Sequence, residues 1–282
     1  MGKTINVIVI FAHPDEGEKY AGGLSAMFAE LGHRVKFLSL TNGDGGHYRL
    51  SGQDLIERRA GEAIEAKNRL GLAEYEILDC PDGALMPTLE LRYEIIKQIR
   101  EWKADIVITF HPEGGAHADN RYAGLAVSDA APFVARVPNV VPEVECLDKA
   151  PIFLLMPDYS MKKRYKADVV VGIDAVLEKK LLGCDAHYSQ FFEYQPWSKG
   201  LTVQELSDWQ ERREILMKDI SEFIHVADEM KPALEKYYGK ERANEFQYAE
   251  PFELAKYNSD GAESRVRALF PMFEHRGGVE SQ

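Results

Sequence analysis

The feature that most constrains this chain is a short apolar run that ends abruptly in ionisable side chains. Residues 7–11 (Val-Ile-Val-Ile-Phe) are followed by Ala-His-Pro-Asp-Glu at positions 12–16. A β-branched run followed by a polar turn and a helical pattern is typical of a buried parallel strand. Ligands bind outside the carboxyl ends of strands in open α/β sheets. We therefore expect His13, Asp15 and Glu16 at a functional edge of a sheet.

Strand and helix patterns alternate along the first two thirds of the chain. The expected strands cover residues 5–11, 34–40, 75–78, 105–110, 151–156 and 168–173. The expected helices cover residues 24–31, 55–70, 89–102 and 122–134, and another runs from 174 past 187. This alternation predicts an α/β, Rossmann-like fold, with a mostly parallel sheet and helices on both faces.

The pattern changes after Trp197, where charged helical sequence continues to about residue 238 and no strand signal is present. Thr202 and Glu205 have the spacing of a capping box, which predicts a helix start. We expect an α/β hydrolase domain over 1–197 and a C-terminal helical appendage over 198–282 packed on it. Residues 263–282 are expected either as a loose tail or as a cover for a neighbouring subunit.

Composition excludes several classes of protein. The 34 Lys and Arg residues against 46 Asp and Glu residues give a net charge of −12, which disfavours nucleic acid and anionic membranes as partners. The three cysteines are far apart and form no C-x-x-C pair, so reduced thiols in a cytoplasmic protein are expected. The N-terminal run is not a signal peptide, and no run is long enough for a membrane span.

A second polar loop follows the strand expected over 105–110. Residues 111–121 (His-Pro-Glu-Gly-Gly-Ala-His-Ala-Asp-Asn-Arg) contain His117, Asp119 and Asn120. The first and fourth strands are often neighbours across the topological switch point of such a sheet, where a crevice opens. We therefore expect this loop and the first loop to meet around one metal ion or one substrate.

The residue types in these two loops suit metal-assisted hydrolysis. His13 and Glu16 are suitable metal ligands, Asp15 a general base, and His117 a partner for the oxyanion or the leaving group. Taken singly, each side chain has a plainer account, as part of a helix cap or as an ordinary loop histidine. The pairing of two such loops at strand ends favours the functional interpretation.

Other residues allow two interpretations each. Asn42 and Asp44 follow the second strand, where they either line the pocket or only form the turn. Arg59 and Glu62, three residues apart on a helix, suit a surface salt bridge. The basic run at 162–164 is expected to be a solvated loop. The aromatic residues at 191, 192, 194 and 197 suit packing, although such rings also stack on sugars.

At these positions the chain resembles the PIG-L/LmbE-like deacetylase family. Residues 12–16 match the family's A-H-P-D-D motif, and residues 117–120 (His-Ala-Asp-Asn) match its H-P-D-H motif. Matching segments also occur at 41–44, 59–62 and 187–190, in the same order. The resemblance implies a bacterial N-deacetylase that hydrolyses the N-acyl group of an N-acetylglucosaminyl substrate with a bound metal, zinc by family precedent.

The resemblance also assigns roles to individual residues. It implies metal ligation by His13, Glu16 and Asn120, catalysis by Asp15, His117 and Asp119, and substrate contacts by Arg59 and His187. Two ligand positions depart from the family, with Glu16 in place of Asp and Asn120 in place of His. An amide oxygen suits calcium or magnesium better than zinc. Weaker zinc binding, another ion, recruitment of His117 as third ligand, and a site without metal all stay open.

The leading hypothesis is therefore a metal-dependent hydrolase that removes an acetyl group from a small N-acetylated amino sugar or its conjugate. The alternative is a catalytically impaired homologue that acts as a carbohydrate-binding or regulatory protein. Retention of Asp15, His117 and Asp119 favours the enzyme. A nucleotide-binding Rossmann enzyme is disfavoured, because the first strand-to-helix turn lacks G-x-G-x-x-G and carries two carboxylates. A homo-oligomer also stays open.

Overall fold

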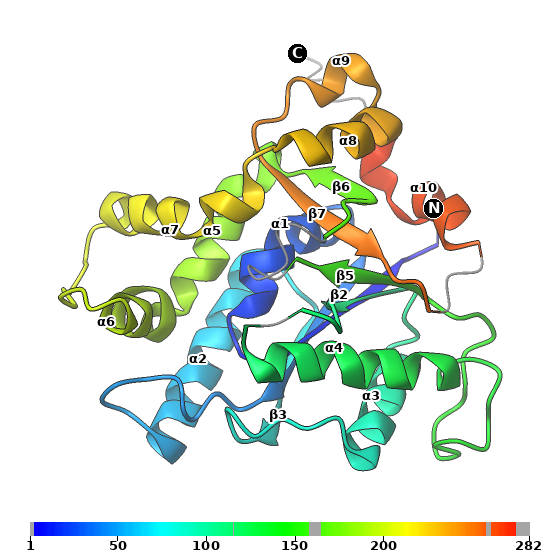
Figure 1. Ribbon diagram of the computed structural model, residues 1–282, viewed down its shortest axis with the longest axis horizontal. Helices are drawn as coiled ribbons and strands as arrows, with labels where there is room; N and C mark the ends of the chain where they lie inside the picture. Colours follow the sequence, from blue (N-terminus) through cyan, green and yellow to red (C-terminus); the bar gives the residue numbers. More distant parts are fainter. Residues whose placement is uncertain (1–2, 115, 158–164, 258–260, 275–282) are drawn as a thin grey trace.

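The fold is a single mixed sheet with helices packed on both of its faces (Figure 1). The computed structural model describes residues 3–114, 116–157, 165–257 and 261–274. Its strands are β1 (Asn6–Phe11), β2 (Arg34–Thr41), β3 (Glu74–Cys80), β4 (Ile106–Phe110), β5 (Ile152–Met156), β6 (Val169–Gly172) and β7 (Ala249–Leu254). The strands expected from the sequence are all present, within a few residues of their predicted bounds.

The helices follow the strands as the alternating pattern predicts. They are α1 (Glu16–Glu30), α2 (Gly52–Leu70), α3 (Leu89–Glu101), α4 (Ala118–Ala130), α5 (Leu177–Ala186), α6 (Gln195–Ser198), α7 (Trp209–Ile224), α8 (Lys231–Tyr238), α9 (Lys240–Ala243) and α10 (Ala262–Leu269). Shorter turns are η1 (Ala131–Phe133), η3 (Asp174–Val176), η5 (Asp228–Met230), η6 (Pro271–Phe273) and the π-helical η4 (Ser189–Tyr194). Within the described part of the chain, none of the helices has the length and apolar character required to span a membrane.

The strand order is β3-β2-β1-β4-β5-β7-β6, and the first five strands of this order are parallel. Strand β1 lies between β2 and β4, with Val7 paired to Val35 on one side and to Ile106 on the other. The prediction that the first and fourth strands are neighbours is confirmed. Their carboxyl ends therefore open side by side at one edge of the sheet.

Both faces of the central strands are buried, as a parallel sheet requires. Val7 and Val9 point into the apolar layer under α1, α2, α5 and α7, whereas Ile8 and Ile10 point into the layer under α3 and α4. All four side chains are completely buried. The expected Rossmann-like α/β fold with helices on both faces is confirmed.

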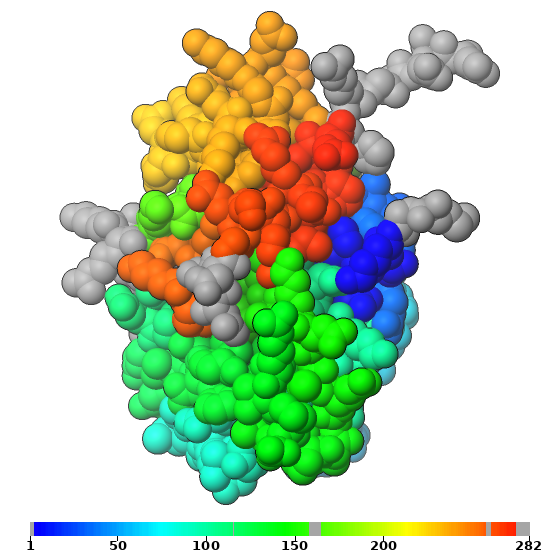
Figure 2. All heavy atoms as spheres, turned by 90° about the vertical axis from the view of Figure 1, so that its right-hand side faces the viewer, coloured from blue at the N-terminus to red at the C-terminus, as the bar shows by residue number. Residues whose placement is uncertain are grey.

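The C-terminal segment is not the purely helical appendage that the sequence indicated. Strand β7 lies inside the sheet, antiparallel to β5 on one side and to β6 on the other. The expected boundary between residues 197 and 198 therefore does not separate two bodies in space. Of the expected tail at 263–282, the part up to residue 273 forms α10 and η6, which pack into the core, and residues 275–282 lie outside the described residues. Figure 2 shows this segment in red beside the blue N-terminal residues.

Two further details differ from expectation. The predicted capping box at Thr202 and Glu205 starts no helix, because α7 begins only at Trp209. Its N-cap is Asp208, whose carboxylate accepts hydrogen bonds from the backbone N–H groups of the next turn. Helix α5 ends at Ala186, so it does not continue past His187. The basic run at 162–164 lies outside the described residues.

Candidate functional site

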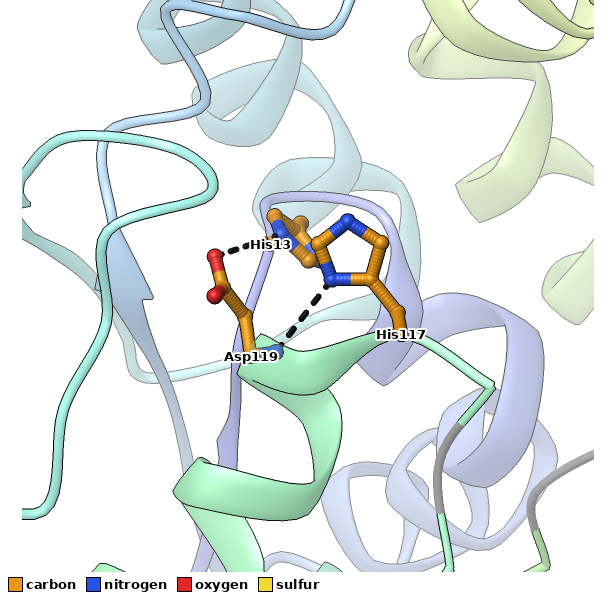
Figure 3. A group of neighbouring side chains, drawn as sticks. All are labelled: His13, His117 and Asp119. Atoms are coloured by element: carbon orange, nitrogen blue, oxygen red, sulfur yellow. Dashed lines mark hydrogen bonds and ion pairs between the residues drawn. The ribbon is translucent and has the colours of Figure 1, made fainter.

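The two loops predicted to meet do so at the carboxyl edge of the sheet. Strand β1 ends at Phe11 and α1 begins at Glu16, so a turn of four residues carries His13. Strand β4 ends at Phe110, and the loop after it leads to His117, the N-cap of α4. The two imidazole rings pack edge to face with their centroids 4.7 Å apart. Figure 3 shows them together with Asp119.

His13 is buried and has three carboxylates around its ring. Its Nδ1 lies 3.2 Å from Oε1 of Glu16, and its Nε2 lies 3.1 Å from Asp82 and 3.4 Å from Asp119. Burial lowers the pKa of His13, but the three carboxylates outweigh burial and raise this pKa well above its usual value. The three carboxylates therefore stabilise a positive charge at this position, either on the protonated His13 ring or on a cation bound next to it.

Glu16 folds back over the turn that precedes its own helix. Its Oε2 accepts hydrogen bonds from the backbone N–H groups of Ala12 (3.1 Å) and His13 (2.8 Å). Its Oε1 is the oxygen that faces the ring of His13. One carboxylate oxygen thus fixes the turn, and the other stays beside the imidazole.

Asp15 adopts an unusual backbone conformation, with φ at 140° and ψ at −19°. Conformations of this kind are costly for a non-glycine residue and cluster at functional sites. Its carboxylate accepts a hydrogen bond of 2.9 Å from Arg59. Burial raises the pKa of Asp15 to about 6, against the lowering effect of the Arg59 charge. The pKa of Asp15 therefore lies above that of an ordinary carboxyl group.

Arg59 is almost completely buried and is anchored by more than Asp15. Its guanidinium also donates to the backbone oxygens of Pro14 (2.7 Å) and Gly43 (3.0 Å). A Cβ on Gly43 would lie 2.4 Å from Nη1 of Arg59, so glycine is needed at that position. The predicted surface pair between Arg59 and Glu62 is not formed, because Glu62 lies against Arg58, 3.3 Å away, instead.

The second loop is fixed by the start of α4. Nδ1 of His117 accepts a hydrogen bond from the backbone N–H of Asp119 (3.3 Å), and Oδ2 of Asp119 accepts one from the N–H of Gly83 (2.7 Å). Asn120 is buried, and its Oδ1 has no hydrogen-bond partner among the described residues. A Cβ on Gly124 would lie 2.4 Å from the backbone oxygen of Phe110, so glycine lets α4 approach the end of β4.

These side chains surround a cavity of about 280 Å³, called here the site cavity. From the first and second loops it is lined by His13, Asp15, Glu16, His117 and Asn120. The other lining residues are Lys19, Tyr20, Gly45, Gly46, Arg59, Asp82, Gln190, Tyr194 and Gln195. The cavity is therefore mostly polar and holds groups of both charges.

The predicted metal ligands can be tested against this geometry. Two ligands of a tetrahedral ion at about 2.1 Å lie about 3.4 Å from one another. The 3.2 Å between Nδ1 of His13 and Oε1 of Glu16 fits this spacing. The unpartnered buried Oδ1 of Asn120 supplies a third acceptor on the same cavity. A second grouping exists, since ligand atoms of His13, His117 and Asp119 lie within 4.8 Å of one another.

The predicted substrate contacts fare differently from one another. Arg59 lines the site cavity, but Asn42, Asp44 and His187 are not among its lining residues. The Oδ1 atoms of Asn42 and Asp44 accept hydrogen bonds from the N–H groups of Asp44 and Asp82, so both residues shape turns. His187 is fully buried and faces Glu18, with Nε2 3.1 Å from Oε1. These three residues therefore lie outside the lining of the site cavity, and their contact with substrate stays a prediction.

Asp82 is a site residue that sequence reasoning missed. It belongs to the Pro81-Asp82-Gly83 segment, which the sequence indicated only as a turn. The available signal was its position after β3, at the same sheet edge as the other loops. Burial raises the pKa of Asp82, but the neighbouring His13 and Arg59 hold it below its usual value. Asp82 is therefore a carboxylate in the site cavity.

Comparison with known proteins places the chain in a family. Residues 8–131 match the family model described as PIG-L, GlcNAc-PI de-N-acetylase. The chain is 33% identical over 195 residues to a diacetylchitobiose deacetylase of Thermococcus kodakarensis, a match that covers 66% of this chain and 70% of that protein. The chain belongs to the PIG-L family. The prediction of a family of N-deacetylases, made from the motifs at 12–16 and 117–120, is confirmed.

Solved structures agree on the fold. The N,N'-diacetylchitobiose deacetylase from Pyrococcus horikoshii superimposes with a TM-score of 0.64 at 21% identity, covering 97% of this chain and 87% of that one. The 4-carboxy-2-hydroxymuconate hydratase GalB from Pseudomonas putida KT2440 gives a TM-score of 0.65 at 16% identity, covering 89% and 95%. A deacetylase and a hydratase thus share this architecture, so the reaction must be argued from the site.

Proposed function

We propose that the protein is a metal-dependent N-deacetylase that removes the acetyl group from an N-acetylglucosamine-type sugar or its conjugate. The similar Thermococcus protein, a diacetylchitobiose deacetylase, supports this substrate class. The observation that carries the proposal is the placement of Asp15. This carboxyl group, with a pKa of about 6, lines the same cavity as His13 and His117.

A divalent metal fits the ligands His13, Glu16 and Asn120, with zinc first by family and calcium or magnesium as alternatives because of the Asn120 amide. Such an ion supplies a polarised amide carbonyl and a more acidic water molecule. The pair of His13 and Glu16 is held in place by neighbouring groups. Backbone N–H groups hold Glu16, and Asp82 and Asp119 flank the far side of the His13 ring.

Asp15 is the general base in this proposal. A base is most effective when its pKa lies near the working pH, and burial brings Asp15 to about 6. Arg59 donates a hydrogen bond to Oδ1 of Asp15 and so fixes the Asp15 carboxylate. The orientation of this carboxylate toward the cavity therefore does not depend on bound substrate. Asp15 takes a proton from the attacking water and is then placed to deliver it to the amine that leaves.

His117 is the group that stabilises negative charge on the acetyl oxygen. Its Nδ1 accepts a hydrogen bond from the Asp119 N–H, so a neutral ring carries its proton on Nε2. The ring is exposed to the site cavity. A fixed N–H donor that faces the developing oxyanion is worth about a hundredfold to a thousandfold in rate. Asp119 positions this donor through its backbone and flanks His13 through its carboxylate.

The test is acetate release from N-acetylglucosamine and its conjugates by the metal-loaded protein. Asp15→Asn should lower kcat by about a hundredfold to ten-thousandfold, as expected for loss of a general base. Asp54→Asn is the matched control, since Asp54 is an exposed carboxylate in the first turn of α2. Thermal melting of both variants checks that the fold is kept.

Two outcomes would count against the proposal. Unchanged acetate release by Asp15→Asn would mean that another group is the base. The wild-type protein could also bind the sugar but release no acetate with zinc, calcium or magnesium. That result would instead support the alternative of a carbohydrate-binding homologue.

A further inference from the structure

A second cavity lies beside the site cavity, between the η4–α6 segment and α7. Its volume is about 560 Å³, against about 280 Å³ for the site cavity. Its apolar walls are Phe191, Phe192, Pro196, Leu201, Leu206 and Ile215. In Figure 1, α6 and α7 lie next to each other at the side of the molecule, joined by the segment that carries Leu201 and Leu206.

The two cavities adjoin each other through a small group of polar side chains. Gln195 lines both of them. Lys19, which lines the site cavity, forms an ion pair of 3.0 Å with Asp219, which lines the second cavity. Asp219 also pairs with Lys199 at 2.9 Å. Gln195 and the Lys19–Asp219 pair therefore form the boundary that a ligand reaching from the site cavity into the second cavity would pass.

The lining of the second cavity indicates what it would accept. Ligand sites are typically concave, of about 300–1,000 Å³, and mainly apolar with a few polar groups. The charged side chains at this cavity are of both signs, Lys199 and Lys218 against Asp219 and Glu222. They therefore give no preference for an anion. The apolar walls favour an uncharged alkyl or aryl group.

We propose that the substrate is an N-acylated amino sugar with an apolar alkyl or aryl substituent, which binds in the second cavity while the sugar occupies the site cavity. This inference rests on the proposed function and extends it to a substrate class. The residues that line the second cavity all lie beyond residue 131, outside the segment that matches the family model. The proposed preference is thus set by residues of the C-terminal half of the chain, outside the segment that matches the family model.

The apolar group has two points of attachment on such a sugar, and the experiment separates them. One series consists of methyl, butyl, hexyl and octyl glycosides of N-acetylglucosamine, used below their micelle concentrations. The other consists of methyl glycosides of glucosamine N-acylated with two, four, six and eight carbons. In one of the two series, kcat/KM should rise about fourfold for each added methylene until the second cavity is filled. A rise in the glycoside series would place the apolar group on the glycosidic oxygen, and a rise in the N-acyl series would place it on the acyl group.

Variants test whether the second cavity causes the gain. Leu201→Asp should abolish most of the chain-length dependence and leave the shortest substrate unchanged. Ile215→Ala, a second change at the cavity wall, should weaken the dependence severalfold without introducing a charge. Ile64→Asp is the matched control, because Ile64 is as exposed as Leu201 (59% against 61%) but lies on α2, away from the cavity.

Binding separates this inference from the proposed function. Asp15→Asn, titrated calorimetrically with the same compounds, reports affinity without turnover. Tighter binding with chain length, but no release of the N-acyl group as a free carboxylate by the wild-type protein, would uphold the second cavity and reject the deacetylase. If neither acyl release nor binding depended on chain length in either series, the inference would be overturned, and an equal gain in the Leu201→Asp variant would overturn it as well.

Discussion

Nη2 of Arg59 lies 2.9 Å from Oδ1 of Asp15, and both groups are largely removed from solvent. The positive charge of Arg59 lowers the pKa of Asp15, which burial has raised to about 6. Arg59→Ala should therefore raise the pKa of Asp15 further. Because the base must be deprotonated to act, the acidic limb of kcat/KM against pH should move to higher pH, with a larger loss of activity at pH 6 than at pH 8.

Arg59→Lys keeps the charge but loses the forked guanidinium, so its acidic limb should move less than that of Arg59→Ala. Arg58→Ala is the control, since Arg58 neighbours Arg59 in sequence but pairs with Glu62 and Glu193. An acidic limb that stays in place in Arg59→Ala would show that Asp15 does not govern the pH profile.

Asp82 should matter for metal binding although it is not a predicted ligand. Its carboxylate lies 3.1 Å from Nε2 of His13, the nitrogen opposite the one that faces Glu16. Outer partners of this kind orient a ligating imidazole, and their loss costs about 10- to 100-fold in metal affinity or activity. We expect Asp82→Asn to weaken zinc binding by that factor, measured by competition with a fluorescent chelator.

Asp129→Asn is the control for Asp82→Asn, because Asp129 forms an exposed pair with Arg92 on the outside of α3 and α4. Zinc affinity within twofold of wild type in Asp82→Asn would mean that Asp119 alone orients His13.

By the resemblance of residues 117–120 to the family motif, Asn120 stands in the place of a histidine ligand. Its buried Oδ1 has no partner among the described residues, so it is available to an ion. An imidazole nitrogen is a better zinc ligand than an amide oxygen. Asn120→His should therefore tighten zinc binding by about tenfold or more and reduce any response to calcium. The same chelator competition, run with both metals, measures this.

Asn120→Ala is the companion variant, and it should weaken zinc binding if Asn120 is a ligand. If neither substitution changes zinc affinity, the ion is held by the other grouping, in which His117 and Asp119 accompany His13.

The sequence predicted the sheet edge and its two loops well, because those features are local. An apolar run that ends in polar residues marks a strand end without any knowledge of distant partners. The assignment of Glu16 also depended on local spacing. The structure adds that one of its carboxylate oxygens accepts hydrogen bonds from the backbone N–H groups of Ala12 and His13.

Strand β7 was missed for a physical reason. Its sequence, Ala-Glu-Pro-Phe-Glu-Leu, contains two charges and a proline, which argue against a strand inside a sheet. Glu250 is buried there because distant groups satisfy it. Lys180 donates to it at 2.7 Å, and the N–H groups of Gly23 and Leu24 in α1 donate at 2.8 and 2.7 Å. No local pattern indicates partners about 70 and 230 residues away.

The surroundings of His187 likewise depend on a distant partner, and they lead to a prediction about stability. It is completely buried beside Glu18, which is also completely buried. Burial lowers the pKa of His187, but Glu18, followed by Asp15 and Glu62, outweighs burial and raises this pKa above its usual value. A raised pKa in the folded state means that the protonated ring stabilises the fold.

This contribution is fully present below about pH 6.5, the pKa of an unfolded histidine, and it is lost as the pH rises through the folded-state pKa of His187. Each unit of the shift corresponds to about 1.4 kcal/mol in the free energy of unfolding. His187→Gln should therefore remove part of the pH dependence of stability and, because Glu18 stays buried without its partner, destabilise the protein by about 3 kcal/mol.

Urea unfolding at pH 5.5 and pH 8.5 measures this effect, with wild type, His187→Gln and the double variant Glu18→Gln/His187→Gln compared. The double variant should recover part of the stability, since it leaves no buried charge without a partner. His225→Gln is the control, because His225 is exposed at the end of α7. The free energy of unfolding could change by the same amount between the two pH values in the wild-type protein and in His187→Gln. That result would show that the His187 ring is neutral in the folded protein.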